Sequence, residues 1–299
     1  MTSTVENSRE LGEWLALPEV REILGPVREI QAVLLEMLQV IDQFCLEHQL
    51  RYYVACGSML GALRNGGLIP WDDDADVLMP REDYDKFVEL AEREMPPEYF
   101  MQSYRTERWY RHPFAKLRKN GTTCIVANHK HLKMHQGVFI DIFPYEGVPE
   151  NAFKAGIMRR GAQILDGLSA FSSAKLNGPL RAMRPIQAVW KLIFSPAFFN
   201  YLCNVLMRMM NDMNSQWLAL NCYRLNDAEY ERNKVKRAWL EPARRISIDG
   251  VSLLVPHEAE ACLRQLYGDW QSLPPPECRH PIHSAGGVID IHKDYREYL

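Results

Sequence analysis

The 299-residue sequence lacks the features that define several classes of protein. Its seven cysteines are scattered and include no CxxC pair, which argues against a disulfide framework or a zinc knuckle and favours a reducing compartment. The first ten residues contain no basic segment that leads into an apolar run, so we expect no secretory signal peptide and a cytoplasmic location.

The sequence also lacks the basic excess that general nucleic-acid binding requires. It contains 35 lysines and arginines against 38 aspartates and glutamates, for a formal net charge of -3. Because binding to nucleic acid depends on neutralising phosphates, we expect no nucleic-acid partner. The charge is unevenly distributed, however. Residues 151–210 contain eight basic residues and one acid, a local net charge of +7.

The composition is that of an ordinary globular protein, with 47% apolar and 24% charged residues. Apolar periodicity and turn residues predict helices at 26–48, 58–64 and 81–93, and strands at 51–56, 74–79, 122–126 and 137–143. Pro80 and Pro144 are expected to end the strands that precede them. This pattern favours an α/β fold of the α+β type, a small mixed sheet flanked by helices.

Three regions are predicted along the chain. Residues 1–150 are expected to contain N-terminal helices and the core with the sheet. Residues 151–245 are expected to form a basic helical insertion, because strand signals are absent up to about residue 239. Residues 246–299 are expected to return to the core as a hairpin around Asp249-Gly250, a helix that begins at Pro256 and an irregular tail.

Two aspartates, Asp74 and Asp76, lie two residues apart on an expected strand. Side chains at this spacing leave the same face of a strand, so the two carboxylates are close enough to share a hard divalent cation. Magnesium fills the rest of its coordination shell with water and phosphate oxygens, so the pair indicates a phosphate-bearing ligand. An isolated run such as Asp72-Asp73-Asp74 would more simply be a solvated turn. Here Trp71 precedes the run and an apolar strand follows it, which favours the metal site.

Two further features support a phosphate site. Gly57-Ser58 forms a small turn at the start of a helix, where backbone N–H groups and the helix dipole can hold a phosphate. Asp141 interrupts the apolar run 138–143, where an unpaired buried charge would be costly. An arginine or backbone donors would compensate it equally well if it stood alone. Together with Asp74 and Asp76, it is expected to be the third metal ligand.

These motifs resemble those of the nucleotidyltransferase superfamily, in which a Gly-Ser turn precedes a DxD strand and a distant third Asp. Within it, residues 57–64 (GSMLGALR) and 68–76 (LIPWDDDAD) are similar to the signature of the LicD family of phosphocholine transferases, which includes the fukutin-related ribitol-phosphate transferases. Residues 139–144 (FIDIFP) resemble its second block. The resemblance covers most of 26–143, resumes near residue 246 and implies a nucleotidyltransferase-like core.

The resemblance implies transfer of a phospho-alcohol, with phosphocholine preferred, from a CDP-linked donor to a hydroxyl of a cell-surface glycan or its lipid-linked precursor. Such glycans include lipopolysaccharide and teichoic acid, and CMP would be released. Asp74, Asp76 and Asp141 would hold Mg²⁺ or Mn²⁺, with Asp141 doubling as the base and Asp72 as an outer member of the carboxylate cluster. Two alternatives remain: a nucleotidyltransferase that uses an NTP and releases pyrophosphate, and a non-catalytic binding protein.

Basic and aromatic side chains are needed to bind such a donor. Arg64, Lys116 and Arg118 are candidates for phosphate contacts, together with the Gly57-Ser58 turn. If the donor carries choline, a cation–π partner is expected, and the aromatic candidates are Trp71, Tyr104, Trp109 and Tyr110. His280 and His283 could either bind substrate or pack the tail.

The basic region 151–210 contains a stretch without charge from Leu192 to Met207, 16 residues long. It is shorter than the roughly 20 apolar residues that a spanning helix needs. An internal helix of the core would account for its apolarity. The surrounding charge of +7 instead favours peripheral association of 151–210 with an anionic membrane, weakened by salt.

Overall fold

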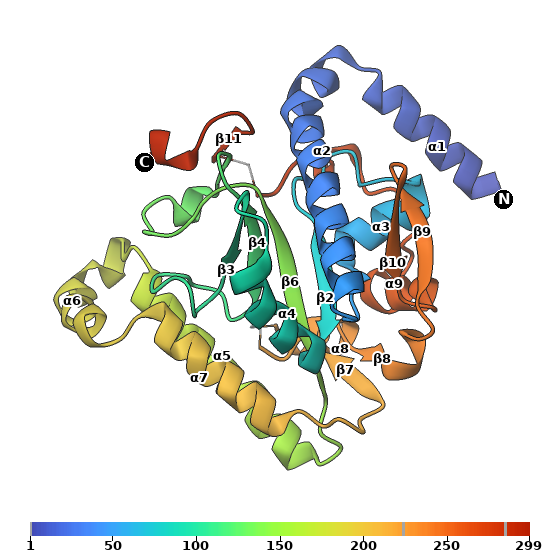
Figure 1. The fold of residues 1–299 in the computed structure, drawn as a ribbon. Helices are drawn as coiled ribbons and strands as arrows, with labels where there is room; N and C mark the ends of the chain where they lie inside the picture. The colour runs from blue at the N-terminus through green and yellow to red at the C-terminus, as the bar shows by residue number, and fades with distance from the viewer. Residues whose placement is uncertain (1, 223–224, 284–285) are drawn as a thin grey trace.

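The computed structural model describes residues 2–222, 225–283 and 286–299 and shows an α+β fold, as expected (Figure 1). Its central sheet has the strand order β1-β2-β6-β4-β3, and only the β2–β6 pair is parallel. These strands comprise β1 (Tyr53–Val54), β2 (Asp76–Pro80), β3 (Tyr99–Gln102), β4 (Ala115–Lys119) and β6 (Phe139–Gly147). Strands β7 (Trp217–Ala219) and β8 (Val235–Lys236) continue the sheet from the far end of β6.

Helices cover both faces of this sheet. The helices of the described residues are α1 (Thr2–Leu15), α2 (Pro18–Glu47), α3 (Cys56–Asn65), α4 (Arg81–Glu94), α5 (Ala152–Ser173), α6 (Arg184–Ile193), α7 (Pro196–Met210), α8 (Asp227–Arg232) and α9 (Ala259–Tyr267), of which α1 and α6 project away from the sheet (Figure 1). The larger hydrophobic core joins α2, α4 and α9 to one face of the sheet. A second core joins α5 and α7 to the opposite face. Among the described residues, no helix combines the length and apolarity needed to cross a bilayer.

The expected helices of the first 100 residues are confirmed, with one change of length. Helix α2 begins at Pro18 rather than near Pro26, because Val20 and Leu24 extend its buried stripe by two turns. Pro26 lies within the helix, where it removes one backbone hydrogen bond. Helix α3 ends at Gly66, whose φ of 76° suits glycine.

Pro144 does not end its strand, contrary to expectation. Strand β6 continues to Gly147, and Pro144 pairs in register with Met79 of β2. The last residue of β6 that faces β4 is Ile142. Pro144 therefore lies where β6 has a neighbouring strand on one side only, and its missing N–H leaves the ladder to β2 intact. The extension carries the strand to Glu146.

The expectation of a strand-free segment up to residue 239 is also wrong. Helices α5, α6 and α7 are present, but β7 pairs with Glu146 and Gly147 of β6 and brings the chain back to the sheet. Farther on, α9 begins at Ala259 rather than Pro256. The backbone N–H groups of His257 and Glu258 instead donate to the carbonyls of Leu240 and Trp239, so these residues fasten the loop before the helix starts.

The expected hairpin is confirmed as β9 (Arg244–Ile248) and β10 (Val251–Val255). Asp249 and Gly250 both have positive φ, 46° and 87°, as a type I′ turn requires. The Asp249 carboxylate accepts a hydrogen bond from the Leu68 N–H at 2.8 Å, so the turn docks on the loop after α3. The tail is not wholly irregular, because β11 (Val288–Asp290) pairs with β5 (Thr123–Ile125).

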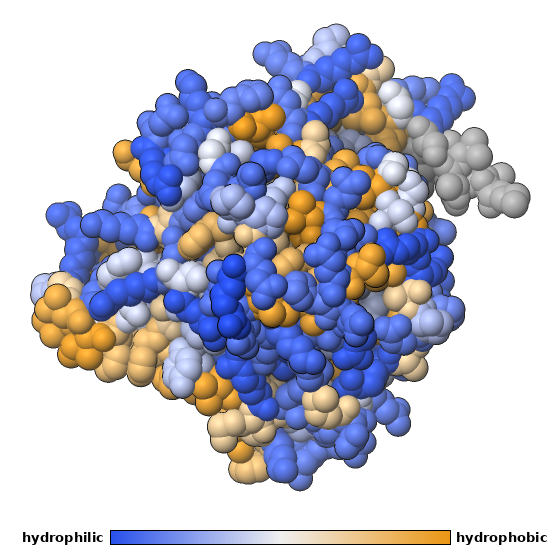
Figure 2. Space-filling view, in the orientation of Figure 1, coloured by the Kyte–Doolittle hydropathy of each residue, from blue (hydrophilic) through white to orange (hydrophobic). Residues whose placement is uncertain are grey.

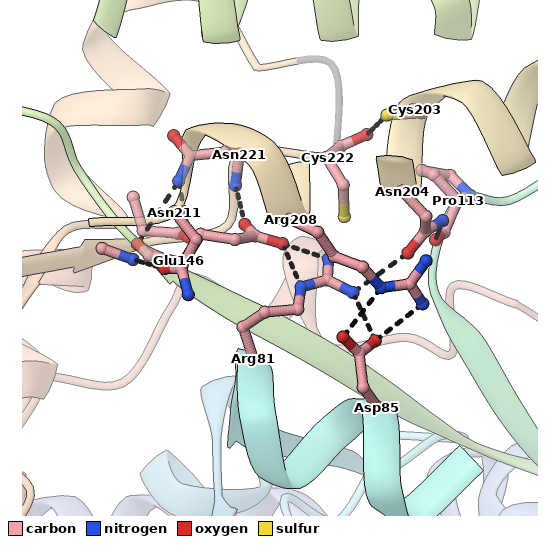
Figure 3. Close-up of polar contacts among 12 residues, drawn as sticks. Arg81, Asp85, Pro113, Glu146, Cys203, Asn204, Arg208, Asn211, Asn221 and Cys222 are labelled. Carbon is pink, nitrogen blue, oxygen red and sulfur yellow. Dashed lines mark hydrogen bonds and ion pairs between the residues drawn. The ribbon is translucent and has the colours of Figure 1, made fainter. Parts of the chain in front are cut away.

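A buried polar network fastens the helical region to the sheet (Figure 3). The Arg81 guanidinium, at the start of α4, donates to the Glu146 carboxylate and to Asn204 Oδ1 of α7 at 3.0 Å. Arg81 and Glu146 are 2% and 0% exposed. Nearer the surface, Asp85 accepts two hydrogen bonds from Arg208 at 2.8 and 2.9 Å. The network joins α4, β6 and α7 through charge-assisted hydrogen bonds.

Candidate functional site

Strand register places three charged side chains in one row across the sheet. Asp76 on β2 is paired with Asp141 on β6, and Asp141 is paired with Lys116 on β4. Neighbouring strands lie about 4.8 Å apart, so paired residues whose side chains point to the same face of the sheet are in contact. The Lys116 ammonium lies 2.5 Å from Asp141 Oδ1, and both side chains are less than 10% exposed.

Asp74 completes a cluster of three carboxylates. It precedes β2, which begins at Asp76 rather than at Asp74 as expected. One carboxylate oxygen from each of Asp74, Asp76 and Asp141 lies within 4.8 Å of the others. An octahedral Mg²⁺ with bonds of about 2.1 Å separates neighbouring ligand oxygens by about 3 Å and opposite ones by about 4 Å. The three hard oxygen donors therefore fit a magnesium or manganese ion after a small contraction.

Gly57 and Ser58, in the first turn of α3, support this carboxylate cluster. A side chain on Gly57 would place its Cβ 2.6 Å from Asp72 Oδ2, so glycine is needed for the close approach of that carboxylate to α3. The Ser58 hydroxyl is buried and accepts a hydrogen bond from the Asp76 N–H at 3.1 Å. Ser58 thus fixes the backbone that carries Asp76, while Gly57 admits Asp72 beside the cluster.

The carboxylates face a cavity of about 340 Å³, a size suited to a small ligand. Its basic wall is Lys116 and Arg118, two of the residues that the sequence nominates for phosphate contacts. Arg118 donates to Gln102 Oε1 and to the Gly137 carbonyl, both at 2.7 Å, which holds its guanidinium in place. Apart from His283, the remaining lining was not predicted and consists of Cys56, His112, Phe114, Val126, His129, Phe139, Phe143, Leu220, Leu225 and Asn233.

His283 is the functional candidate from the tail. Its Nε2 lies 2.8 Å from Asp74 Oδ2, and its backbone N–H donates to Asp73 Oδ1 at 3.1 Å. Asp73, Asp74 and His283 form a second group with metal-ligand atoms within 4.8 Å. The sequence leaves His283 open between substrate binding and packing, and the structure places it at the site. His280 is exposed and does not line the cavity.

The electrostatics of the cluster follow from burial and mutual repulsion. Burial and the neighbouring Asp74 raise the pKa of Asp72 to about 8. Burial, Asp74 and Asp141 raise the pKa of Asp76 well above its usual value. Although burial opposes it, the hydrogen bond from His283 holds the pKa of Asp74 below its usual value. Burial and repulsion disfavour the ionised carboxylates of this cluster, and a divalent cation between them would offset both effects.

The contribution of Asp72 to the stability of the metal-free chain is expected to fall as pH rises from about 4 to about 8. Asp72 has a higher pKa folded than unfolded, so the folded chain binds more protons and loses stability until that carboxyl ionises. Burial lowers the pKa of His129 to about 3, so this imidazole is neutral throughout the interval. Urea unfolding in EDTA should show a smaller slope for Asp72→Asn than for wild type, and equal slopes would contradict the assignment.

The structure does not bring Arg64 to the cavity. Arg64 lies at the far end of α3, where its guanidinium donates to the Ser272 carbonyl at 3.3 Å. The four expected aromatic partners of choline also lie elsewhere. Trp71 packs edge-on against Trp14, Tyr110 is fully buried, Tyr104 contacts Tyr201, and Trp109 contacts Arg108. Phe114, Phe139 and Phe143 line the cavity in their place.

Comparison with known proteins adds a family match. The family model described as LicD/FKTN/FKRP, nucleotidyltransferase domain, matches residues 49–165. The lipopolysaccharide cholinephosphotransferase LicD of Haemophilus influenzae is 28% identical over 270 residues, which are 88% of this chain and 98% of that protein. Uncharacterized proteins of Rickettsia prowazekii and Rickettsia typhi are 23% identical over 120 residues and 28% identical over 72 residues. These matches cover 40% and 24% of this chain, and 41% and 22% of the relatives.

Proposed function

Since this chain belongs to the LicD family, we propose that it transfers phosphocholine from CDP-choline to a saccharide hydroxyl and releases CMP. The observation that carries the proposal is the group of three carboxylates within 4.8 Å of one another, in a cavity that also contains Lys116 and Arg118. The name of the Haemophilus relative supports a transferase of phosphocholine to lipopolysaccharide. The acceptor is therefore proposed to be a lipopolysaccharide, or its lipid-linked precursor in the cytoplasm.

Each part of the site has a role in this reaction. Asp74, Asp76 and Asp141 would hold Mg²⁺ or Mn²⁺, which supplies charge neutralisation of the donor diphosphate. The acceptor oxygen forms a bond to the phosphorus that carries choline, while the bond from that phosphorus to the oxygen of CMP breaks. Asp141, whose pKa burial raises, receives the acceptor proton. Lys116 and Arg118 contact the phosphate oxygens. Gly57 and Ser58 do not line the cavity, and they act on the site through Asp72 and the backbone of Asp76.

The products distinguish this proposal from its alternatives. The full chain is incubated with Mg²⁺, lipopolysaccharide and either CDP-choline or CTP, and phosphorus NMR identifies the products. CMP together with phosphocholine on the acceptor supports the proposal. Pyrophosphate from CTP, without CMP from CDP-choline, would identify a nucleotidyltransferase instead. Binding of CDP-choline without turnover on any acceptor would indicate a non-catalytic binding protein.

Choline recognition is proposed to involve Phe143. The Lys116 ammonium lies 3.5 Å from the centre of the Phe139 ring, so that ring already faces a cation. Phe143 lines the same cavity and is half-buried, edge-on to Phe114 with 4.7 Å between ring centres. A quaternary ammonium against an aromatic face gains about 0.5 to 2 kcal/mol.

Phe143→Leu is therefore expected to raise the KM for CDP-choline about threefold to tenfold, with little change in the KM for CDP-glycerol. Steady-state kinetics with both donors measures the difference. Phe153→Leu, which changes an exposed ring on α5 outside the cavity, is the matched control. An equal rise for both donors would mean that Phe143 shapes the cavity without recognising choline.

A further inference from the structure

Helix α6 is amphipathic in the reverse of the usual sense. Ile186, Val189 and Ile193, which are spaced three and four residues apart, are 64%, 60% and 67% exposed, and Leu192 is 78% exposed. The only buried residue of the helix is a polar one, Gln187. Helices on a protein surface normally turn their apolar stripe inward. The aliphatic face of α6 is thus left without a partner in the structure.

This orientation is fixed by specific contacts. Gln187 Nε2 donates to the carbonyls of Phe171 and Ala174, at 2.7 and 3.0 Å, at the end of α5. The Trp190 indole donates to Ser172 Oγ at 2.8 Å and stacks on Phe199 of α7. Because the polar side chains satisfy buried acceptors on the inner side, rotation of α6 to bury its aliphatic face would break these bonds.

The surface around α6 is basic and apolar. Residues 167–211 contain no aspartate or glutamate. The basic residues on η2 and α6 and just before them are Lys175, Arg181, Arg184 and Lys191, whereas Arg208, at the far end of α7, is paired with Asp85. The short helix η2 (Gly178–Met183), which leads into α6, adds exposed Leu180 and Met183 to the apolar surface. Figure 2 shows apolar residues gathered on the left-hand projection of the molecule, where Figure 1 places α6.

We propose that η2 and α6 seat the protein on an anionic phospholipid bilayer, with the aliphatic face of α6 among the acyl chains and the basic residues at the headgroups. Clustered positive charge beside an exposed aliphatic helix complements such a surface. A second copy of the chain fits less well, since a symmetric contact through α6 would bring two clusters of four basic residues together. The membrane contact expected of 151–210 thus narrows to 178–193, since α7 buries Cys203 and Met207 against the core.

A hydrogen bond near the end of α5 connects the proposed membrane surface to the segment that forms part of the cavity wall. His131 Nε2 lies 2.8 Å from the Ser173 carbonyl, at the end of α5 that supports α6. His131 follows η1 (Ala127–His129), which carries a residue of the cavity wall. Membrane contact does not depend on which group is transferred. If the proposed acceptor is lipid-linked, the same contact would bring its saccharide toward the cavity.

Flotation with vesicles tests the proposal on the full chain. We expect binding to vesicles in which about one third of the lipid is phosphatidylglycerol, weak binding to pure phosphatidylcholine, and release at high salt. The double variant Ile186→Gln/Ile193→Gln should reduce binding to anionic vesicles at least about tenfold. The matched control is Ile23→Gln/Leu46→Gln, which changes two exposed aliphatic residues of α2 and should bind as wild type does.

Thermal unfolding must show that both double variants are folded. We expect the α6 variant to fold, because Ile186 and Ile193 are exposed in the wild type. Loss of binding in the α6 variant alone, at unchanged melting temperature, supports the membrane contact. Equal recovery with neutral and anionic vesicles, or recovery with neither, overturns it. A concentration-dependent dimer in analytical ultracentrifugation, dissociated by the α6 variant and indifferent to vesicles, would show that a second copy covers this face. CMP release in solution is measured separately, so the failure of either proposal is visible alone.

Discussion

Asp76→Asn is expected to reduce phosphocholine transfer at least about a thousandfold, since a metal contributes several kcal/mol of transition-state stabilisation and about 4 kcal/mol corresponds to that factor. Mg²⁺ should raise the melting temperature of the wild type, and this rise should be absent from the variant. In EDTA its stability should hold or increase, because burial and the charges of Asp74 and Asp141 disfavour ionised Asp76. Opposite effects on stability with and without Mg²⁺ would distinguish a lost ligand from a damaged fold.

A control and two companion variants sharpen this test. Glu150→Gln makes the same change of charge at an exposed position and should alter neither turnover nor the response to Mg²⁺. Asp74→Ala should also abolish transfer. Asp141→Ala differs, because it leaves the buried Lys116 ammonium without its carboxylate, so loss of stability is expected beside loss of activity. Asp141→Asn is the more informative change there. Turnover at the wild-type rate in Asp74→Ala or Asp76→Asn would refute a shared metal site.

Glu146→Ala is expected to give the largest loss of stability, about 3 to 5 kcal/mol, because it leaves the Arg81 guanidinium buried beside an empty space. Glu146 also accepts a hydrogen bond from the Asn221 N–H at 3.2 Å, so the substitution loosens the chain after β7 as well. The variant should unfold at lower urea concentration. Urea unfolding followed by circular dichroism measures the change.

Two comparisons isolate the buried pair. Glu89→Ala removes one partner of an exposed ion pair, in which Glu89 and Arg93 lie one turn apart on α4. This change should alter stability little. The double variant Arg81→Met/Glu146→Leu replaces both charges with apolar groups and should recover much of the loss. If Glu146→Ala is no worse than Glu89→Ala, the network of Figure 3 does not hold the helical region to the sheet.

The parts of the fold that the sequence predicts are those set by local pattern. The stripe of α2, the turn at Asp249-Gly250 and the glycine end of α3 each depend on residues a few positions apart. The errors arise where a distant segment decides. Pro144 remains in β6 because β4 has ended beside it, and α9 starts late because the preceding backbone hydrogen-bonds to residues 239 and 240.

The candidate site divides in the same way. Asp74 and Asp76 are near in sequence, and Asp141 is conspicuous because it is charged within an apolar run, so all three can be predicted. His283 approaches Asp74 from more than 200 residues away, and no local pattern specifies that contact. Arg64 illustrates the opposite error. Arg64 is only seven residues from Gly57 in the sequence, but the two residues lie at opposite ends of α3. Arg64 is therefore about one helix length from the cavity.

The contact between His283 and Asp74 also fixes when the site can be completed during synthesis. A growing polypeptide that has reached residue 245 already contains the three clustered carboxylates, but the imidazole opposite Asp74 and the backbone donors to Asp73 have not been translated. Because N-terminal segments fold first on the ribosome, the acidic core forms ahead of the segment that closes one wall of its cavity. Truncated translation products would therefore carry a repelling acidic cluster without its histidine, and the finished site depends on the last part of the chain to be made.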